Sequence, residues 1–173
     1  MRRRSFLGWC AGILSSLLGL IGCRPGPRVG IHAGQRATLE AATERIFPGA
    51  RQAQVATYVE RALAHPYFRT LREPMRRGLD LLQAVAQSFY SADFAACDES
   101  QQDAVLEHVQ AGNADTPDFP ASRFFERLIM LTLEGTLGDP THGGNKDCAG
   151  WKFIGYEPGA PKPGTCGGHD RHK

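Results

Sequence analysis

Hydrophobic residues recur every three or four positions along much of the chain, and no segment alternates convincingly between apolar and polar residues. Spacing of this kind places apolar side chains on one face of a helix. It predicts helices over residues 36–47, 51–64, 70–90 and 121–135, with a further helix that starts after Asp98 and ends before Gly112-Asn113. The pattern therefore indicates an all-α fold, a small helical domain of about five helices.

Residues that cap or break helices mark the ends of these segments. Thr38 and Asp98 are candidate N-caps. Pro48 and Pro66 are expected to end the first and second helices, and Pro74 fits the first turn of the third. The third helix is predicted to turn these side chains inward: Leu71, Met75, Leu79, Leu82, Val85, Ala86 and Phe89.

Residues 121–135 stand apart because they are apolar around much of the helix circumference. A helix with this pattern is expected in the middle of a domain, where neighbours cover it on several sides. The residues concerned are Phe124, Phe125, Leu128, Ile129, Leu131, Thr132 and Leu133.

The first 23 residues have the pattern of an export signal. Three arginines precede an apolar run from Trp9 to Gly22, which is shorter than the roughly 20 residues that a membrane span needs. Arg3, Arg4, Phe6 and Leu7 fit the twin-arginine motif of bacterial signals, which direct folded proteins across the membrane. The alternative is an ordinary secretory signal with one additional arginine.

The signal ends at Leu20-Ile21-Gly22-Cys23, which resembles a bacterial lipobox. In that motif Cys23 carries diacylglycerol, and the small Gly22 gives the peptidase access to the next bond. The alternative is a signal that merely contains a cysteine. We accordingly divide the chain into a signal (1–23), a flexible tether (24–35), a helical domain (36–157) and a Pro/Gly-rich tail (158–173).

The charge balance argues against nucleic-acid binding. Beyond the signal the chain has 17 basic and 18 acidic residues, so its basicity belongs to the N-terminus.

The five cysteines bear on redox state and on cofactors. Cys10 leaves with the signal, and lipidation would consume Cys23, which leaves Cys97, Cys148 and Cys166. An odd number of thiols in an oxidising compartment suggests one for another chain. No Cys-x-x-Cys-His motif is present, so covalent haem c is not expected on this chain.

The segment "LGDPTHGGNKDCAGWKFIGY", residues 137–156, combines glycines with large apolar side chains. Asp139 and Pro140 are expected to start a turn, and Gly143-Gly144 to allow positive φ angles in a tight reversal. The motif lacks the strand and the Gly-Lys-Ser/Thr of a phosphate loop. We expect an irregular arm that contacts a partner protein, with the alternative that its rings pack on the domain's own core. The aromatic and aliphatic members are Trp151, Phe153, Ile154 and Tyr156.

Catalytic motifs are not evident. The chain has no Gly-x-Ser-x-Gly nucleophile elbow and no obvious pair of catalytic acids. We predict no catalytic, cofactor or metal residues on this chain. A weaker alternative is a metal site, whose ligand types suit zinc but whose spacing does not: His142, Cys148, Cys166, His169 and His172.

"LEGTLGDPTHGGNKDCAGWKFIGY" resembles the gluconate 2-dehydrogenase subunit 3 family, in its motif E-G-x-x-x-D-P-x-x-G-G-N…G-W-x-x-I-G-Y. The segment "LEAATERIFPGARQAQVATYVERAL" is similar to the family's N-terminal helices, and the resemblance covers about residues 36–157. The matching motif positions are Glu134, Gly135, Asp139, Pro140, Gly143, Gly144, Asn145, Gly150, Trp151, Ile154, Gly155 and Tyr156.

This resemblance implies a non-catalytic small subunit without a cofactor. Such subunits accompany an FAD-containing catalytic subunit of the glucose-methanol-choline (GMC) type, which oxidises a CH–OH group of a sugar or sugar acid. A cytochrome c subunit with haem c often passes the electrons to quinone. The small subunit carries the twin-arginine signal, and the catalytic subunit is exported with it through the twin-arginine translocase. A lipobox cysteine is not a feature of every member.

Two hypotheses follow. The first is an accessory and export subunit in the periplasm, held at the membrane by a lipid anchor or by its complex, with Cys148 as the candidate disulfide to the partner. The second is a free-standing periplasmic lipoprotein that binds ligands, with the His/Cys tail as a metal site.

Overall fold

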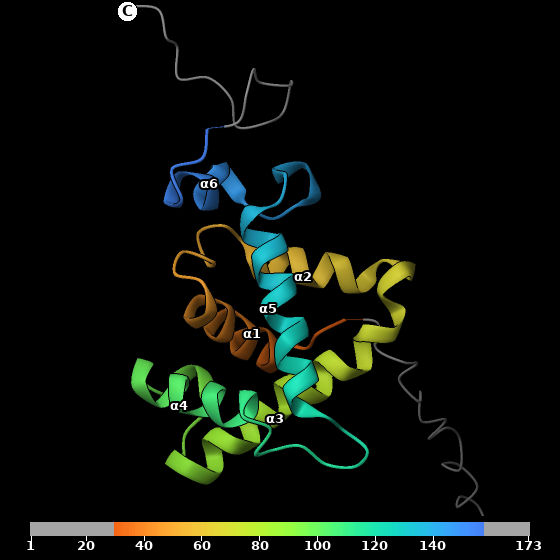
Figure 1. Cartoon of the computed structure of the whole chain (residues 1–173), viewed down its shortest axis with the longest axis vertical. Helices are drawn as coiled ribbons and strands as arrows, with labels where there is room; N and C mark the ends of the chain where they lie inside the picture. Colours follow the sequence, from red (N-terminus) through yellow and green to blue (C-terminus); the bar gives the residue numbers. More distant parts are fainter. Residues whose placement is uncertain (1–29, 158–173) are drawn as a thin grey trace, which may run out of the picture.

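The computed structural model describes residues 30–157, and the export signal, Cys23, most of the tether and the tail lie outside this range. The described part is all-α, as predicted, and its helices gather around one core (Figure 1). The α-helices are α1 (Ala33–Ile46), α2 (Val55–Ala64), α3 (Arg72–Tyr90), α4 (Glu99–Gln110), α5 (Ala121–Leu137) and α6 (Ala149–Phe153). The 3₁₀ turns are η1 (Pro66–Leu71), η2 (Phe94–Ala96), η3 (Pro140–His142) and η4 (Lys146–Cys148).

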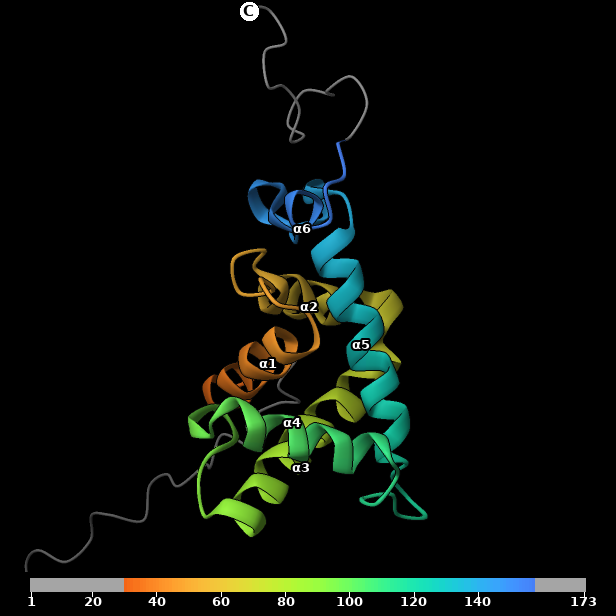
Figure 2. The same ribbon diagram turned by 60° about the vertical axis from the view of Figure 1, so that its left-hand side comes forward.

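Helix α5 is the central helix, which confirms the prediction from its apolar circumference. It contacts α1, α2, α3 and α4 along its length and α6 at its C-terminal end (Figures 1 and 2). Phe124, Leu128 and Leu131 are buried in these contacts. The packing is close enough that a Cβ atom on Gly78 of α3 would overlap the ring of Phe124. Leu133, in contrast, is 40% exposed, so this part of the apolar circumference is not covered by a neighbouring helix.

Helix α1 begins at Ala33, three residues before the predicted start of the helical domain, and takes in the last residues assigned to the tether. Its cap is His32, whose Nδ1 accepts a hydrogen bond from the Gln35 backbone N–H, while the Gln35 side chain accepts one from the His32 N–H. Histidine is not among the common N-cap residues. Thr38 lies inside the helix and bonds to the carbonyl of Gly34.

The other predicted helix ends are mostly correct. Asp98 caps α4 and forms a capping box with Gln101. Helix α1 ends before Pro48, and α2 ends before Pro66. Helix α2 begins at Val55 rather than near 51, because the preceding residues form turns that finish with Gln54 in the left-handed region, at φ 57°.

Helix α3 buries most of the side chains predicted to point inward, but not Phe89. That ring is 48% exposed and packs edge-on against His108 of α4, with 5.0 Å between ring centroids. Its neighbour Tyr90 is partly buried against the core.

In the part of the chain that the structure describes, no helix is long and apolar enough to cross a membrane.

Candidate partner-binding surface

The C-terminal end of α5 has carbonyl groups that no further helical turn can satisfy. The chain that follows, residues 138–156, folds back over this end and supplies the missing donors. The backbone N–H of Asn145 donates to the carbonyl of Gly135 at 2.6 Å, and the indole Nε1 of Trp151 donates to the carbonyl of Leu137 at 2.6 Å. The segment that looked like an isolated loop in the sequence is therefore the cap of the central helix.

Asn145 holds this cap together from a fully buried position. Its side-chain Nδ2 donates to the carbonyl of Gly138 at 2.9 Å, and its Oδ1 accepts the N–H of Gly150 at 2.9 Å. Its backbone is in the left-handed region, at φ 45°, which asparagine tolerates better than most residues. One side chain thus joins the end of α5 to the start of α6.

The glycines of the segment act in two different ways. Gly143 has φ 92°, as predicted for a tight reversal. Gly144 is not in the positive-φ region, so that part of the prediction is wrong; instead, a Cβ atom there would overlap the Gly135 carbonyl. Gly150 is required for the same reason, because its Cβ atom would overlap the carbonyl of Thr136.

The turn predicted at Asp139-Pro140 is present. Oδ1 of Asp139 accepts the backbone N–H of Thr141 at 2.9 Å and the Thr141 hydroxyl at 2.7 Å. Pro140 is the first residue of η3. This turn begins the reversal that returns the chain to α5.

Glu134, the first residue of the motif, pairs with Tyr58 of α2. The Tyr58 hydroxyl donates to Oε2 of Glu134 at 3.1 Å, and its ring lies against Gly135. Partial burial, the nearby carboxylate and this hydrogen bond raise the pKa of Tyr58 to about 12. The neutral phenol therefore helps to hold α2 against α5. No pattern in the sequence indicated this pair.

From Ala149 the segment forms the short helix α6, so the prediction of a wholly irregular arm is wrong. Trp151 lies partly buried on the inner side of α6. Phe153, Ile154 and Tyr156 are 63%, 52% and 52% exposed. Large apolar side chains are seldom left so exposed together unless they have a contact to make.

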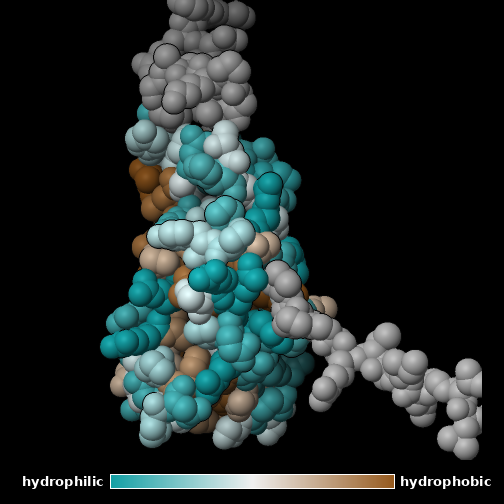
Figure 3. Space-filling model, turned by 90° about the vertical axis from the view of Figure 1, so that its right-hand side faces the viewer, coloured by the Kyte–Doolittle hydropathy of each residue, from teal (hydrophilic) through white to brown (hydrophobic). Residues whose placement is uncertain are grey.

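We call the exposed residues Phe153, Ile154 and Tyr156, together with Phe47, the aromatic patch. The rings of Phe153 and Phe47 meet edge to face at 5.2 Å, and Trp151 supports Tyr156 in the same manner at 5.3 Å. Apolar side chains reach the surface towards the end of the molecule that carries α6 (Figure 3). Phe47 was not predicted as part of this surface, because it lies far from Phe153 in the sequence and the two rings meet only in the folded chain.

The aromatic residues of the segment thus divide between the two predicted roles. Trp151 serves the domain itself, while Phe153, Ile154 and Tyr156 form surface. Lys146 connects the same segment to the loop between α1 and α2, through its N–H and the carbonyl of Ala53 at 3.1 Å. The patch therefore stands on a base that is hydrogen-bonded to two other parts of the fold.

Cys148 is buried and disulfide-bonded, and the other half of its disulfide lies outside residues 30–157. A sulfur in a disulfide within the chain is not available to another protein, which argues against the predicted cross-link from Cys148 to a partner. The same bond removes Cys148 from the alternative metal site, since a metal requires the thiolate. Cys97 is free and buried, and burial raises the pKa of its thiol, with a smaller contribution from Asp98.

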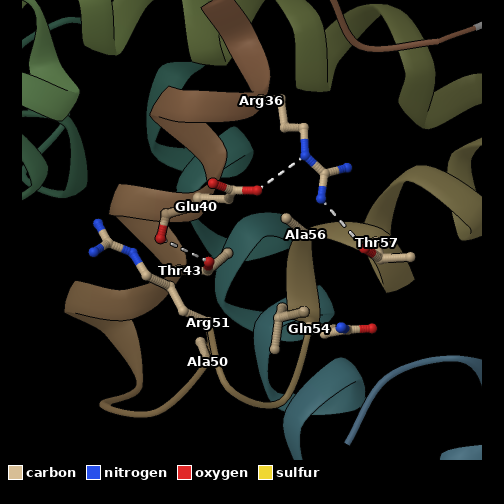
Figure 4. A pocket seen from close by; sticks show the side chains of 9 residues that line it. Arg36, Glu40, Thr43, Ala50, Arg51, Gln54, Ala56 and Thr57 are labelled. Atoms are coloured by element: carbon tan, nitrogen blue, oxygen red, sulfur yellow. Dashed lines mark hydrogen bonds and ion pairs between the residues drawn. The ribbon is translucent and has the colours of Figure 1, made fainter. Parts of the chain in front are cut away.

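A cavity of about 250 Å³ lies between α1, α2 and the loop that joins them (Figure 4). Its charged lining residues are Arg36, Glu40 and Arg51, and the first two pair with each other. Arg36 pairs with Glu40 and with Glu60, and its guanidinium also donates to the hydroxyl of Thr57 at 3.3 Å. The cavity therefore marks a polar cross-link between two helices, and the aromatic patch remains the better candidate for a functional surface.

Residues 33–159 of the chain match the family model described as gluconate 2-dehydrogenase subunit 3. The match includes all of the helices described above and the whole aromatic patch. We find no significant match for the chain among curated proteins or among solved structures.

Proposed function

The chain belongs to the gluconate 2-dehydrogenase subunit 3 family, and from this membership we propose that it is the accessory small subunit of a periplasmic, FAD-dependent dehydrogenase of the GMC type. In this proposal it binds the catalytic subunit and carries it through the twin-arginine export route. The chain itself holds no cofactor. FAD belongs to the catalytic subunit, and haem c to a cytochrome subunit where one is present.

The observation that carries the proposal is the aromatic patch. Three exposed apolar side chains, Phe153, Ile154 and Tyr156, project from a segment whose backbone is fixed to the end of α5. Rigid aromatic side chains of this kind are favoured anchors in protein interfaces, because little conformational entropy is lost when they are buried. We assign the contact with the catalytic subunit to this patch.

The remaining steps of the proposal concern the N-terminus. Arg3 and Arg4 direct the chain, folded and bound to its partner, to the twin-arginine translocase. Cys23 then becomes the site of the lipid anchor, which holds the complex at the periplasmic side of the membrane. A diacylglycerol supplies the two acyl chains that stable anchoring requires.

Co-expression of the tagged chain with a GMC-type catalytic subunit encoded beside it tests the proposal. We expect a yellow, flavin-containing protein to co-purify from the periplasmic or membrane fraction. Replacing Arg3→Lys and Arg4→Lys together should keep both proteins in the cytoplasm. Purification of the small subunit alone, or normal export of the partner in the double variant, would contradict the proposal.

A further inference from the structure

One side of the domain is basic although the domain as a whole is acidic. Residues 30–157 contain 12 basic and 17 acidic residues, but residues 61–77 contain five arginines and one glutamate. Three of these arginines, Arg69, Arg72 and Arg76, are spaced three and four apart along η1 and α3, which places them on one side. Together with the adjacent Tyr67 we call them the basic face.

The positive charge of this face is only partly neutralised. Arg69 is exposed and has no ion pair among residues 30–157. Arg72 donates to the backbone carbonyls of Leu63 and Ala64, which carry no net charge. Arg76 lies 3.7 Å from Glu73, and that acid is the one carboxylate of the segment.

Tyr67 lies in the same 3₁₀ turn as Arg69 and is 80% exposed, the most exposed large apolar side chain among residues 30–157. Its ring stands edge-on to Phe68, with 5.1 Å between centroids, and Phe68 itself packs against the core. An amphipathic ring beside several cations suits the headgroup region of a membrane, where the ring meets acyl chains and the hydroxyl stays in water.

The position of the chain's N-terminal end indicates what this face meets. His32 lies 3.8 Å from Asp80 of α3, and the Gln35 side chain donates to the backbone carbonyl of Arg76 at 3.3 Å. The start of α1 therefore lies at the edge of the basic face, at the end of α1 opposite the α1–α2 loop (Figure 1). Asp80 is the acid that borders the face at this edge.

Only six residues, 24–29, separate Cys23 from the first described residue. Covalent geometry limits their reach to about 25 Å, while a domain of this size has a radius of gyration of about 14 Å. With a lipid on Cys23, the face beside the start of α1 is held within reach of the headgroups.

We propose that the basic face, Tyr67 with Arg69, Arg72 and Arg76, lies against the anionic lipid surface of the membrane. The contact orients the domain and leaves the aromatic patch directed towards the partner. This inference rests on the lipid anchor of the proposed function.

The test uses the mature protein purified from membranes and reconstituted into vesicles of phosphatidylglycerol and phosphatidylcholine, with brominated or ordinary acyl chains. Tyr67→Trp introduces a fluorophore at the basic face, and Phe89→Trp is the matched control. Phe89 is also exposed but lies about 25 Å away along α3. Bromine should quench the introduced indole of the Tyr67→Trp variant and not that of the Phe89→Trp variant. Trp151 contributes the same background to both.

A second comparison isolates the charge. In the Tyr67→Trp background, Arg69→Glu should lower the quenching by roughly half or more, because each cation contributes a similar share of binding to an anionic surface. Arg51→Glu is the control, since Arg51 is exposed in the loop between α1 and α2. High salt should have the same effect as Arg69→Glu.

Equal quenching of the Tyr67→Trp and Phe89→Trp variants, or quenching that ignores Arg69→Glu, would overturn the proposal. Emission from the Tyr67→Trp variant that changes only when the catalytic subunit binds would overturn it as well and would assign the face to a protein contact. Mass spectrometry of the N-terminus reports the anchor separately. Co-purification and export report the proposed function, and neither depends on the lipid composition of the vesicles.

Discussion

The indole Nε1 of Trp151 donates a hydrogen bond of 2.6 Å to the backbone carbonyl of Leu137, fourteen residues earlier in the chain. This bond makes Trp151 a capping group for the central helix. Trp151→Phe should cost about 1 kcal/mol of unfolding free energy through the lost bond, and Trp151→Ala about 2–3 kcal/mol through the lost packing as well. Urea denaturation of the two variants checks the order. If Trp151→Ala were as stable as the wild type, the capping role would be contradicted and Trp151 would be assigned to the partner-binding surface instead.

The buried Asn145 should be more sensitive than its small size suggests. Asn145→Ala leaves the Gly138 carbonyl and the Gly150 N–H without their partners and places alanine in the left-handed region. We expect a loss of roughly 2–4 kcal/mol. Asn113→Ala is the matched control, because Asn113 is exposed and its side chain makes no hydrogen bond within residues 30–157. Thermal denaturation in which both variants melt alike would refute the role of Asn145.

The aromatic patch should matter for binding rather than for folding. Replacing Phe153→Ser and Ile154→Ser together should weaken binding of the catalytic subunit by about tenfold or more, since truncation of an interface anchor commonly costs more than 1 kcal/mol. The melting temperature should change little, because both side chains are more than half exposed. Phe89→Ser serves as the control for an exposed aromatic residue elsewhere. Affinity that is unchanged in the double variant would remove the patch from the interface.

Alkaline pH should destabilise the contact between α2 and α5. The pKa of Tyr58 is about 12 in the folded chain and about 10 when unfolded, so only the unfolded state loses this proton between those values. The contribution of the neutral Tyr58 to the free energy of unfolding is therefore complete below pH 10 and is lost as the pH rises towards 12. Between pH 10 and pH 12 the free energy of unfolding should fall less in the Tyr58→Phe variant than in the wild type. In a spectrophotometric titration of the four tyrosines, the variant should lack the last one to ionise.

The disulfide of Cys148 should be closed by Cys166 in the mature protein. In the proposed export route Cys10 leaves with the signal and lipidation consumes the sulfur of Cys23. Since Cys97 is free, Cys166 is the remaining thiol. Non-reducing peptide mapping should recover a peptide pair containing Cys148 and Cys166. A heavier band that contains the catalytic subunit and disappears with reductant would instead restore the cross-link between subunits.

The helices could be predicted from the sequence because apolar spacing and helix-ending residues are local signals. These residues act on their immediate neighbours. Asp98 caps the start of α4, and α1 and α2 end before Pro48 and Pro66, as expected. The start of α1 was missed because His32 is an unusual cap, which depends on its side-chain conformation rather than on its residue type.

Local patterns in the chain were enough to establish the all-α class, the central position of α5 and the presence of a turn at Asp139. Each follows from residues close together in the sequence. Which aromatic side chains face the solvent was settled by the three-dimensional packing instead. Trp151 and Phe153 are two residues apart and similarly apolar in the sequence, yet one bonds to Leu137 and the other meets Phe47 at the surface. The difference arises because the cap on α5 joins segments that are distant in the chain, and contacts of that kind leave no periodic pattern in the sequence.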